Sequence, residues 1–120
     1  APDLDDEDIE SISTQLVQSE LEGLIATNTT LARTAVRGHV HAEEVGGLSG
    51  APLTGKSAEV VRKFRARLPL DMPIVGVGGV SCPESAREMF TAGASVLQIY
   101  TSFIYKGPKL VQELTNDSLL

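Results

Sequence analysis

The glycine-rich run between residues 73 and 82 is the stretch of the sequence best suited to holding a ligand. This segment, PIVGVGGVSC, is apolar and breaks into glycines, among them Gly78 and Gly79, before it reaches Ser81 and then Pro83. Glycines at the end of a strand let a ligand approach the backbone closely. A helix that begins just afterwards would point free N–H groups at an anion. The segment therefore predicts a phosphate-binding turn.

The same glycines also fit other kinds of turn. A dinucleotide-binding fingerprint would need a glycine in place of Ser81 and an acidic residue at a later strand end, and this sequence has neither. A Walker loop is excluded because no Gly-Lys-Ser/Thr follows the glycines. Two other interpretations of the glycine-rich turn are stronger than a dinucleotide-binding site. The first is a tight strand–helix turn whose glycines serve only steric needs, and the second is the phosphate site of a (β/α)8 barrel.

Two other apolar runs end in residues that could contact a ligand. The run after the glycines ends in QIYT, where Tyr100 and Thr101 would supply an N–H group and a hydroxyl. An earlier run ends in TNTT, which contains Thr27, Asn28 and Thr29. The amide of Asn28 suits a planar amide-like ligand, although an asparagine that caps a loop is the alternative. The carboxyl ends of parallel strands meet on one rim, so we expect these residues to lie together.

The elements that would position these residues alternate along the chain. Helical spacing, capping residues and short apolar runs predict helices over 5–20, 57–68, 83–93 and 107–120, and strands within 21–30, 73–80 and 95–101. Asp5 or Asp6 would cap the first helix and Ser57 the second. The alternation implies right-handed crossovers and a parallel sheet that is covered on both faces. Residues 31–56 fit neither period, and a connection of this length is expected to be functional.

Composition narrows the classes of function. The formal net charge of −6 argues against nucleic acid as a partner. The acidic opening is not a signal peptide, and no apolar stretch reaches the roughly 18–20 residues of a membrane span. Cys82 is the only cysteine, which excludes an internal disulfide and fits a reducing compartment. Because Ala1 is not Met and three strands leave two open sheet edges, we expect an intracellular segment of a larger closed domain.

Three further features have a structural and a chemical interpretation. His39 and His41 lie two residues apart in the long connection, but a metal site needs further ligands, so a solvated loop is favoured and no metal site is predicted. Cys82 near a helix start is either a reactive thiol or, as favoured here, a small packed residue. The basic run RKFRAR at residues 62–67 is interpreted as a solvated helix face rather than an anion site.

The motifs TNTT, GGLSG, GVGGV and LQIYTSFIYKGP, in this order, resemble the C-terminal part of the dihydroorotate dehydrogenases. The class 2, quinone-dependent branch is the most similar, and the resemblance covers nearly the whole chain. It implies an α/β fold: the C-terminal portion of a (β/α)8 TIM barrel, with about three parallel strands and four helices, in which residues 1–120 form a single partial domain. It also implies FMN as cofactor and the oxidation of dihydroorotate to orotate, in pyrimidine synthesis, with quinone as electron acceptor.

The resemblance also implies which residues contact the cofactor and the substrate. Asn28 and Thr29 would hydrogen-bond the pyrimidine. The residues expected to contact FMN are Thr27, Ser49, Gly50, Gly78, Gly79, Tyr100 and Thr101. Ser49 and Gly50 would lie against the flavin, and the last four residues of that list would hold the phosphate.

Part of the family's machinery has no counterpart in these residues. The class 2 catalytic base is a serine from the earlier half of the barrel, so no catalytic residue is predicted here; Ser49, Ser81 and Ser102 do not match its motif. The family also has a lysine that would stand just before Ala1, outside these residues. Its amino-terminal helices, which bind quinone and the membrane surface, are outside these residues too. For the full-length protein the resemblance implies peripheral attachment at the cytoplasmic side of the membrane. The alternative is a non-catalytic half-barrel that binds FMN only when combined with the missing amino-terminal half.

Overall fold

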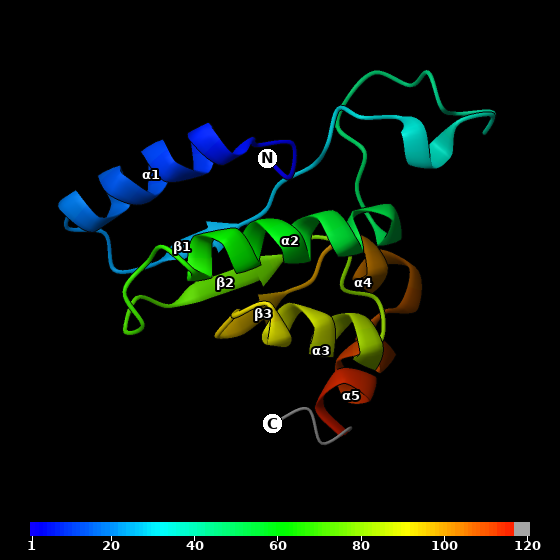
Figure 1. Ribbon diagram of the computed structural model, residues 1–120. Helices are drawn as coiled ribbons and strands as arrows, with labels where there is room; N and C mark the ends of the chain where they lie inside the picture. Colours follow the sequence, from blue (N-terminus) through cyan, green and yellow to red (C-terminus); the bar gives the residue numbers. More distant parts are fainter. Residues whose placement is uncertain (117–120) are drawn as a thin grey trace.

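The computed structural model describes residues 1–116, and its helices alternate with strands along the chain (Figure 1). The elements, with η marking 3-10 helices, are α1 (Asp6–Gln18), β1 (Leu24–Ala26), η1 (Thr34–Val36), η2 (Ala51–Leu53), α2 (Thr54–Arg65), β2 (Ile74–Val77), α3 (Pro83–Thr91), β3 (Val96–Gln98), α4 (Thr101–Lys106) and α5 (Pro108–Asn116). The predicted alternation is confirmed, with one additional α-helix. Within the described residues, no helix is long and apolar enough to cross a membrane.

The strands form one parallel sheet in the order β1-β2-β3. Ile25 lies beside Val75, and Val75 lies beside Val96, so the residues of this row share one face. Each strand is shorter than the apolar run that predicted it, because the ladder ends before Thr27 in β1 and before Gly78 in β2. Polar and glycine residues therefore follow neighbouring strands at the same edge of the sheet.

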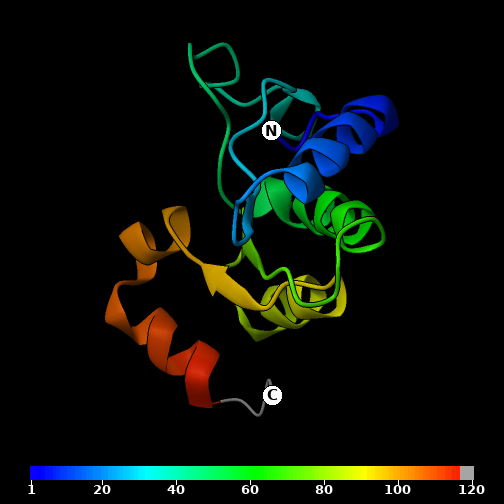
Figure 2. The same cartoon turned by 90° about the vertical axis from the view of Figure 1, so that its left-hand side faces the viewer.

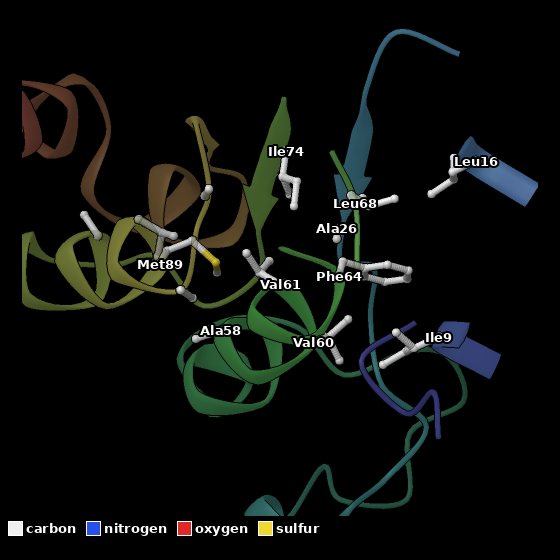
Figure 3. Close-up of a cluster of buried hydrophobic side chains, with 14 residues drawn as sticks. Ile9, Leu16, Ala26, Ala58, Val60, Val61, Phe64, Leu68, Ile74 and Met89 are labelled. Carbon is white, nitrogen blue, oxygen red and sulfur yellow. The ribbon is translucent and has the colours of Figure 1, made fainter. Parts of the chain in front are cut away.

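Helices cover one face of this sheet. Figure 2 shows α1, α2 and α3 on the same side of the strands. Their buried apolar side chains form a single core with Ala26 and Ile74 of the sheet (Figure 3). On the opposite face, Ile25 is 63% exposed and Val96 is 53% exposed. Only one face of the sheet is covered within the described residues, as expected for three strands taken from a larger closed domain.

Helix α1 begins as predicted, with Asp5 as its cap. The Asp5 carboxylate accepts the Asp8 N–H at 2.8 Å, and the Asp8 side chain accepts the Asp5 N–H at 3.4 Å. This reciprocal arrangement satisfies two amide groups that have no partner inside the helix. Ile9 and Leu16 then place the apolar face of α1 in the core, whereas Val17 is exposed.

Helix α2 begins earlier than predicted. The 3-10 turn η2 leads directly into it, so that Thr54 is already helical. Ser57 consequently lies inside the helix and is fully buried, and the expectation that it caps the helix is wrong. Val60, Val61 and Phe64 are also buried, and these four positions form one stripe at helical spacing.

The bounds of α3 and the start of α5 agree with the prediction. Pro83 is the first residue of α3, and Gly93 follows the end of that helix with a φ of +111°. Helix α5 begins at Pro108. The predicted closing helix spans 107–120, of which residues 117–120 lie outside the described residues.

Helix α4 is the element that the sequence pattern missed. The predicted strand at 95–101 ends at Gln98, and α4 starts at Thr101. The residues Phe103, Ile104 and Tyr105 are types enriched in strands, and six residues are too few to show a helical period. The helical structure of this segment therefore depends on its contacts with the rest of the fold rather than on its local sequence preference.

The long connection between β1 and α2 is irregular apart from η1 and η2, and it projects away from the sheet in Figure 1. Thr30 and Leu48 close its base, with N–H···O distances of 3.0 and 2.8 Å in the two directions. The Arg33 guanidinium donates to the carbonyl groups of Thr30 at 3.2 Å, Leu31 at 3.1 Å and Glu44 at 3.3 Å. These contacts hold the end of the long connection beside the end of β1. Residues 49 and 50, which come directly after Leu48, therefore lie near the carboxyl end of that strand.

Candidate functional site

A cavity of about 610 Å³ lies at the carboxyl ends of the three strands. Its volume is within the range of about 300–1,000 Å³ that is common for small-molecule sites. The predicted site residues all line it: Thr27, Asn28, Thr29, Ser49, Gly50, Gly78, Gly79, Tyr100 and Thr101. The expectation that separate strand ends share one rim is therefore confirmed.

Thr27 is fixed by the neighbouring strand and by helix α2. Its N–H donates to the Val77 carbonyl at 2.6 Å, and its hydroxyl lies 3.2 Å from the same oxygen. The hydroxyl also lies 2.9 Å from the hydroxyl of Ser57. Ser57 was not predicted as a site residue. The available signal was a serine within the apolar stripe of α2, at helical spacing from Val60, Val61 and Phe64.

Asn28 and Thr29 lie at the rim and use part of their polar groups locally. The Asn28 Oδ1 atom accepts the Thr29 N–H at 2.8 Å, which is the turn-forming role considered as an alternative for this residue. None of the hydrogen bonds among the described residues uses the Asn28 Nδ2 group, and the side chain is exposed. Thr29 packs so closely on Gly47 that a Cβ there would lie 1.9 Å from the Thr29 hydroxyl. The rim therefore has one free amide donor and one packed hydroxyl.

Asp3 anchors the chain just beyond these rim residues. Its carboxylate accepts hydrogen bonds from the Thr30 hydroxyl at 2.6 Å, the Leu31 N–H at 3.1 Å and the Lys56 ammonium at 3.0 Å. The hydrogen bonds from Thr30 and then from Lys56 are the main causes that lower the pKa of Asp3 from 3.8 to about 2. Asp3 thereby joins the start of the chain to the segment after β1 and to α2. Sequence reasoning did not single it out, because its partners are distant along the chain.

Ser49 and Gly50 lie next to the start of α4. The Thr101 hydroxyl donates to the Ser49 hydroxyl at 3.0 Å. A Cβ on Gly50 would lie 3.2 Å from the Thr101 side chain. The end of the long connection and the segment after β3 therefore meet at the cavity.

Gly78 and Gly79 form a turn that only glycine can adopt here. Their φ angles are +117° and +84°, a region that side chains disfavour. A Cβ on Gly78 would lie 2.3 Å from the Ser57 hydroxyl, and one on Gly79 would lie 2.4 Å from the Thr54 backbone nitrogen. Packing against α2 thus requires both glycines whatever else they bind, so the steric interpretation and the phosphate interpretation are both compatible with this geometry.

The helix after the glycines does not offer its N-terminus to the cavity. The Ser85 hydroxyl accepts the N–H groups of Ser81 at 2.9 Å and Cys82 at 3.1 Å, and Cys82 takes part in a capping box with Ser85. The expectation that α3 points free N–H groups at the site is therefore wrong. Of the described residues, Thr101 and Ser102 at the start of α4 line the cavity, and Ser81 and Cys82 do not.

The site has a neutral lining. Among the described residues, none that lines the cavity has an acidic or basic side chain. The donors that it offers are backbone N–H groups, hydroxyls and the side-chain amides of Asn28 and Gln98. Such donors can hold a polar ligand by hydrogen bonds, including a phosphate at a glycine turn.

The two histidines lie outside this cavity, in the long connection. His41 Nδ1 lies 3.3 Å from Glu44 Oε1, and the His39 and His41 rings are 5.6 Å apart. Residues 1–116 contain no group of three or more possible metal ligands.

The basic run on α2 is largely engaged with other parts of the protein. Lys63 pairs with Asp6 at 2.7 Å, and Arg67 pairs with Glu10 at 2.8 Å, so both contact α1. Arg65 donates to the Met72 carbonyl at 2.8 Å. These contacts position the helices of the outer layer and lie away from the cavity.

Parallel strands joined through helices, with a ligand-sized cavity at their carboxyl ends, define an α/β domain of the kind that binds small molecules at this edge. A family model, dihydroorotate dehydrogenase, matches residues 1–118. The chain belongs to this family.

Curated relatives agree with the family model. A protein from Paraburkholderia phymatum named dihydroorotate dehydrogenase (quinone) is 56% identical over 113 residues, and one of the same name from Burkholderia pseudomallei is 54% identical over 113 residues. Each match covers 94% of this chain and 33% of the relative. The chain therefore spans about a third of the length of the curated relatives it matches.

Solved structures show the same relationship in three dimensions. A ligand-free type dihydroorotate dehydrogenase from Eimeria tenella matches with a TM-score of 0.91 at 35% identity, over 98% of this chain and 32% of that chain. A dihydroorotate dehydrogenase from the same organism in complex with ferulenol matches with a TM-score of 0.89 at 36% identity, over 97% of this chain and 31% of that chain. The expected fold class, an α/β portion of a TIM barrel, is confirmed.

Proposed function

We propose that the full-length protein containing these residues oxidises dihydroorotate to orotate, with FMN as cofactor and a quinone as electron acceptor, in pyrimidine (UMP) synthesis. Family membership and the names of the relatives support this proposal. The observation that carries it is the gathering of the TNTT, GGLSG, GVGGV and QIYT residues around one cavity.

The phosphate of FMN would bind where the glycine turn meets the start of α4. Gly78 and Gly79 line the cavity at the turn after β2, and Tyr100 and Thr101 line it from the neighbouring strand end. These groups are neutral donors, which fits a phosphate held by backbone N–H groups and a hydroxyl. The fit of the donor set to FMN supports the phosphate interpretation over the purely steric one.

The flavin would lie between β1 and the end of the long connection. Thr27 borders the cavity on one side, and Ser49 and Gly50 border it on another. The hydrogen bond from Thr101 to Ser49 joins this part of the lining to the phosphate part. One ligand that reaches from the glycine turn to β1 would contact all of these residues.

The pyrimidine substrate would meet Asn28 and Thr29. The Nδ2 group of Asn28 is free to donate to a ring carbonyl, because only Oδ1 is used locally. The Thr29 hydroxyl lies beside it, positioned by its close contact with Gly47. A planar ring with alternating carbonyl and N–H groups matches this pair of side chains.

Bound FMN would supply the two-electron redox chemistry that links dihydroorotate to quinone. The residues of this chain bind and orient the two ligands. We assign none of them the role of base, because in this proposal the serine that removes the proton belongs to the earlier half of the barrel. Ser49 and Ser102 line the cavity but do not match the motif of that serine.

Quinone access and localisation depend on parts outside these residues. We propose that the full-length protein attaches peripherally to the cytoplasmic side of the membrane through its amino-terminal region, where it would reach quinone. The support is the name of the relatives, which specifies quinone.

A second proposal concerns the 120 residues by themselves. They would form a non-catalytic half-barrel that binds FMN only when combined with the amino-terminal half. The observation that favours it is the uncovered face of the sheet, where Ile25 and Val96 are more than half exposed.

Turnover assays of the full-length protein with different electron acceptors test the proposed function. We expect orotate to form with a short-chain ubiquinone and not with fumarate or NAD⁺. Turnover with a soluble acceptor alone would contradict the quinone assignment and leave the substrate assignment intact. A protein that holds FMN but forms no orotate with any acceptor would overturn the proposed function.

A further inference from the structure

Ser57 is a buried polar side chain that reaches the site from the helix layer. It is 0% exposed, and its hydroxyl lies 2.9 Å from the Thr27 hydroxyl. No other hydrogen bond of the Ser57 hydroxyl occurs among the described residues. Val60, Val61 and Phe64 share its stripe on α2 and are apolar and buried. A lone hydroxyl in such a stripe is costly unless its single partner satisfies it.

The hydrogen bonds around Thr27 determine which hydroxyl donates. The Thr27 hydroxyl can donate to the Val77 carbonyl at 3.2 Å or to the Asn28 carbonyl at 3.3 Å. If it donated to Ser57 instead, the buried Ser57 hydrogen would have no acceptor. Every group is satisfied when Ser57 donates to Thr27 and Thr27 donates to a backbone carbonyl. In this arrangement Thr27, which lines the cavity, has no free hydrogen, and its hydroxyl oxygen can accept one further hydrogen bond.

The glycine turn packs closely against the Ser57 hydroxyl. A Cβ on Gly78 would lie only 2.3 Å from it and 3.1 Å from the Thr27 hydroxyl. The glycine turn, the end of β1 and α2 therefore meet at this pair of hydroxyls. The direction of the Thr27 hydroxyl is set from outside the cavity, by a residue that does not line it.

We propose that Ser57 is a positioning residue that orients the Thr27 hydroxyl as a hydrogen-bond acceptor for an N–H or O–H group of FMN. This inference rests on the proposed function, in which Thr27 contacts the cofactor. Ser57 acts through Thr27 and touches neither FMN nor substrate. It adds to the site a residue that the family motifs of this chain do not include.

A double-mutant cycle on FMN affinity tests the proposal. The full-length apoprotein is titrated with FMN, and flavin fluorescence gives Kd for the wild type, Ser57→Ala, Thr27→Val and the double variant. Ser57→Ala fits the space and favours the helix, so it should fold. We expect it to raise Kd about fivefold, the value of one net hydrogen bond. In the Thr27→Val background the same change should have no further effect.

Ser13→Ala is the matched control. The Ser13 hydroxyl is also buried on a helix, but it makes no hydrogen bond among the described residues, and it does not line the cavity. Its removal should leave Kd unchanged. An unchanged Kd in Ser57→Ala, or an equal rise with and without the Thr27 hydroxyl, would overturn the positioning role while FMN binding by the wild type still stands. A wild-type protein that binds no FMN would overturn the proposed function together with this inference.

Discussion

At the scale of single residues, the chain beyond β1 depends on one carboxylate. Asp3 accepts hydrogen bonds from Thr30, Leu31 and Lys56, which belong to different parts of the fold. The charged form of Asp3 is stabilised by these donors, so its pKa falls to about 2. A carboxyl whose pKa is lower in the folded state stabilises that state above its unfolded pKa, and this contribution disappears as the pH falls through the folded pKa.

Replacing Asp3 by Asn should therefore destabilise the full-length protein in a pH-dependent way. At pH 7 we expect a loss of about 1 kcal/mol in the free energy of unfolding, discounted because the Asp3 side chain is 32% exposed. The difference from wild type should shrink as the pH falls from about 4 toward 2, measured by urea unfolding. Asp71→Asn, at an exposed loop residue, is the control. A difference that stays constant over this pH range would contradict the role of the charge.

Asn28→Ala should separate substrate binding from cofactor binding. Asn28 lies at the rim with a free Nδ2 group, so its loss should raise KM for dihydroorotate by about tenfold or more, with FMN content unchanged. Steady-state kinetics and the flavin absorbance of the purified variant measure the two effects. Asn116→Ala, at the exposed end of α5, should change neither. Loss of FMN with an unchanged KM would contradict the substrate role.

Site residues could be predicted from the sequence where a polar residue or a glycine follows a predicted strand. Thr27, Asn28 and Gly78 were found in this way, and they line the cavity. Asp3 and Ser57 were missed, since each acts through a partner tens of residues away that only the fold brings near. The sequence does not show which distant residue the Asp3 carboxylate, in the turn before α1, or the Ser57 hydroxyl will contact.

At the scale of elements, a helix was predicted accurately where its sequence has a clear cap and a clear helical period. Helices α1 and α3 have clear caps and periods, and their starts agree with the prediction. Helix α4 has strand-forming residues and only six positions, so the sequence pattern predicted no helix there. The start of α2 was misplaced because η2 continues into it without a side-chain cap.

The glycine turn provides the prediction at this scale. Gly79→Ala would place a Cβ 2.4 Å from the backbone nitrogen of Thr54, which cannot move without shifting α2. Gly46 also has a positive φ, of +121°, but nothing lies within 4 Å of a Cβ there. We expect Gly46→Ala to cost about 1 kcal/mol, from backbone strain alone. Gly79→Ala should cost at least about 2 kcal/mol more, because the clash adds to the strain.

Urea unfolding of the two full-length variants gives the comparison, and their FMN content gives a second readout. Gly46 does not line the cavity, so its variant should retain FMN. Equal destabilisation by the two substitutions would contradict the close packing of the turn on α2.

At the scale of the whole molecule, the described residues leave one face and both edges of the sheet open. Helices α1, α2 and α3 lie on one side of the sheet, and the row Ile25, Val75 and Val96 is on the opposite face, where Ile25 and Val96 are more than half exposed. The strands β1 and β3 are both edges of this sheet. Edges and apolar faces of this kind pair with other chains unless something covers them. The site is at the rim of the same open sheet.

The isolated 120-residue chain should therefore self-associate. Sedimentation over a range of concentrations should show species larger than the monomer, and added FMN should not be retained through gel filtration. Supplying the remaining part of the barrel as a separate chain should suppress the association and restore FMN binding. A compact monomer with a cooperative thermal transition would contradict this view of the open face.

The visible absorbance of the full-length protein under anaerobic conditions shows whether the gathered strand-end residues hold FMN beside dihydroorotate. We expect a bound flavin spectrum that bleaches when dihydroorotate is added and returns when a ubiquinone is supplied. A protein that neither contains FMN nor binds it from solution, or whose flavin spectrum is unchanged by dihydroorotate, would contradict the proposed site.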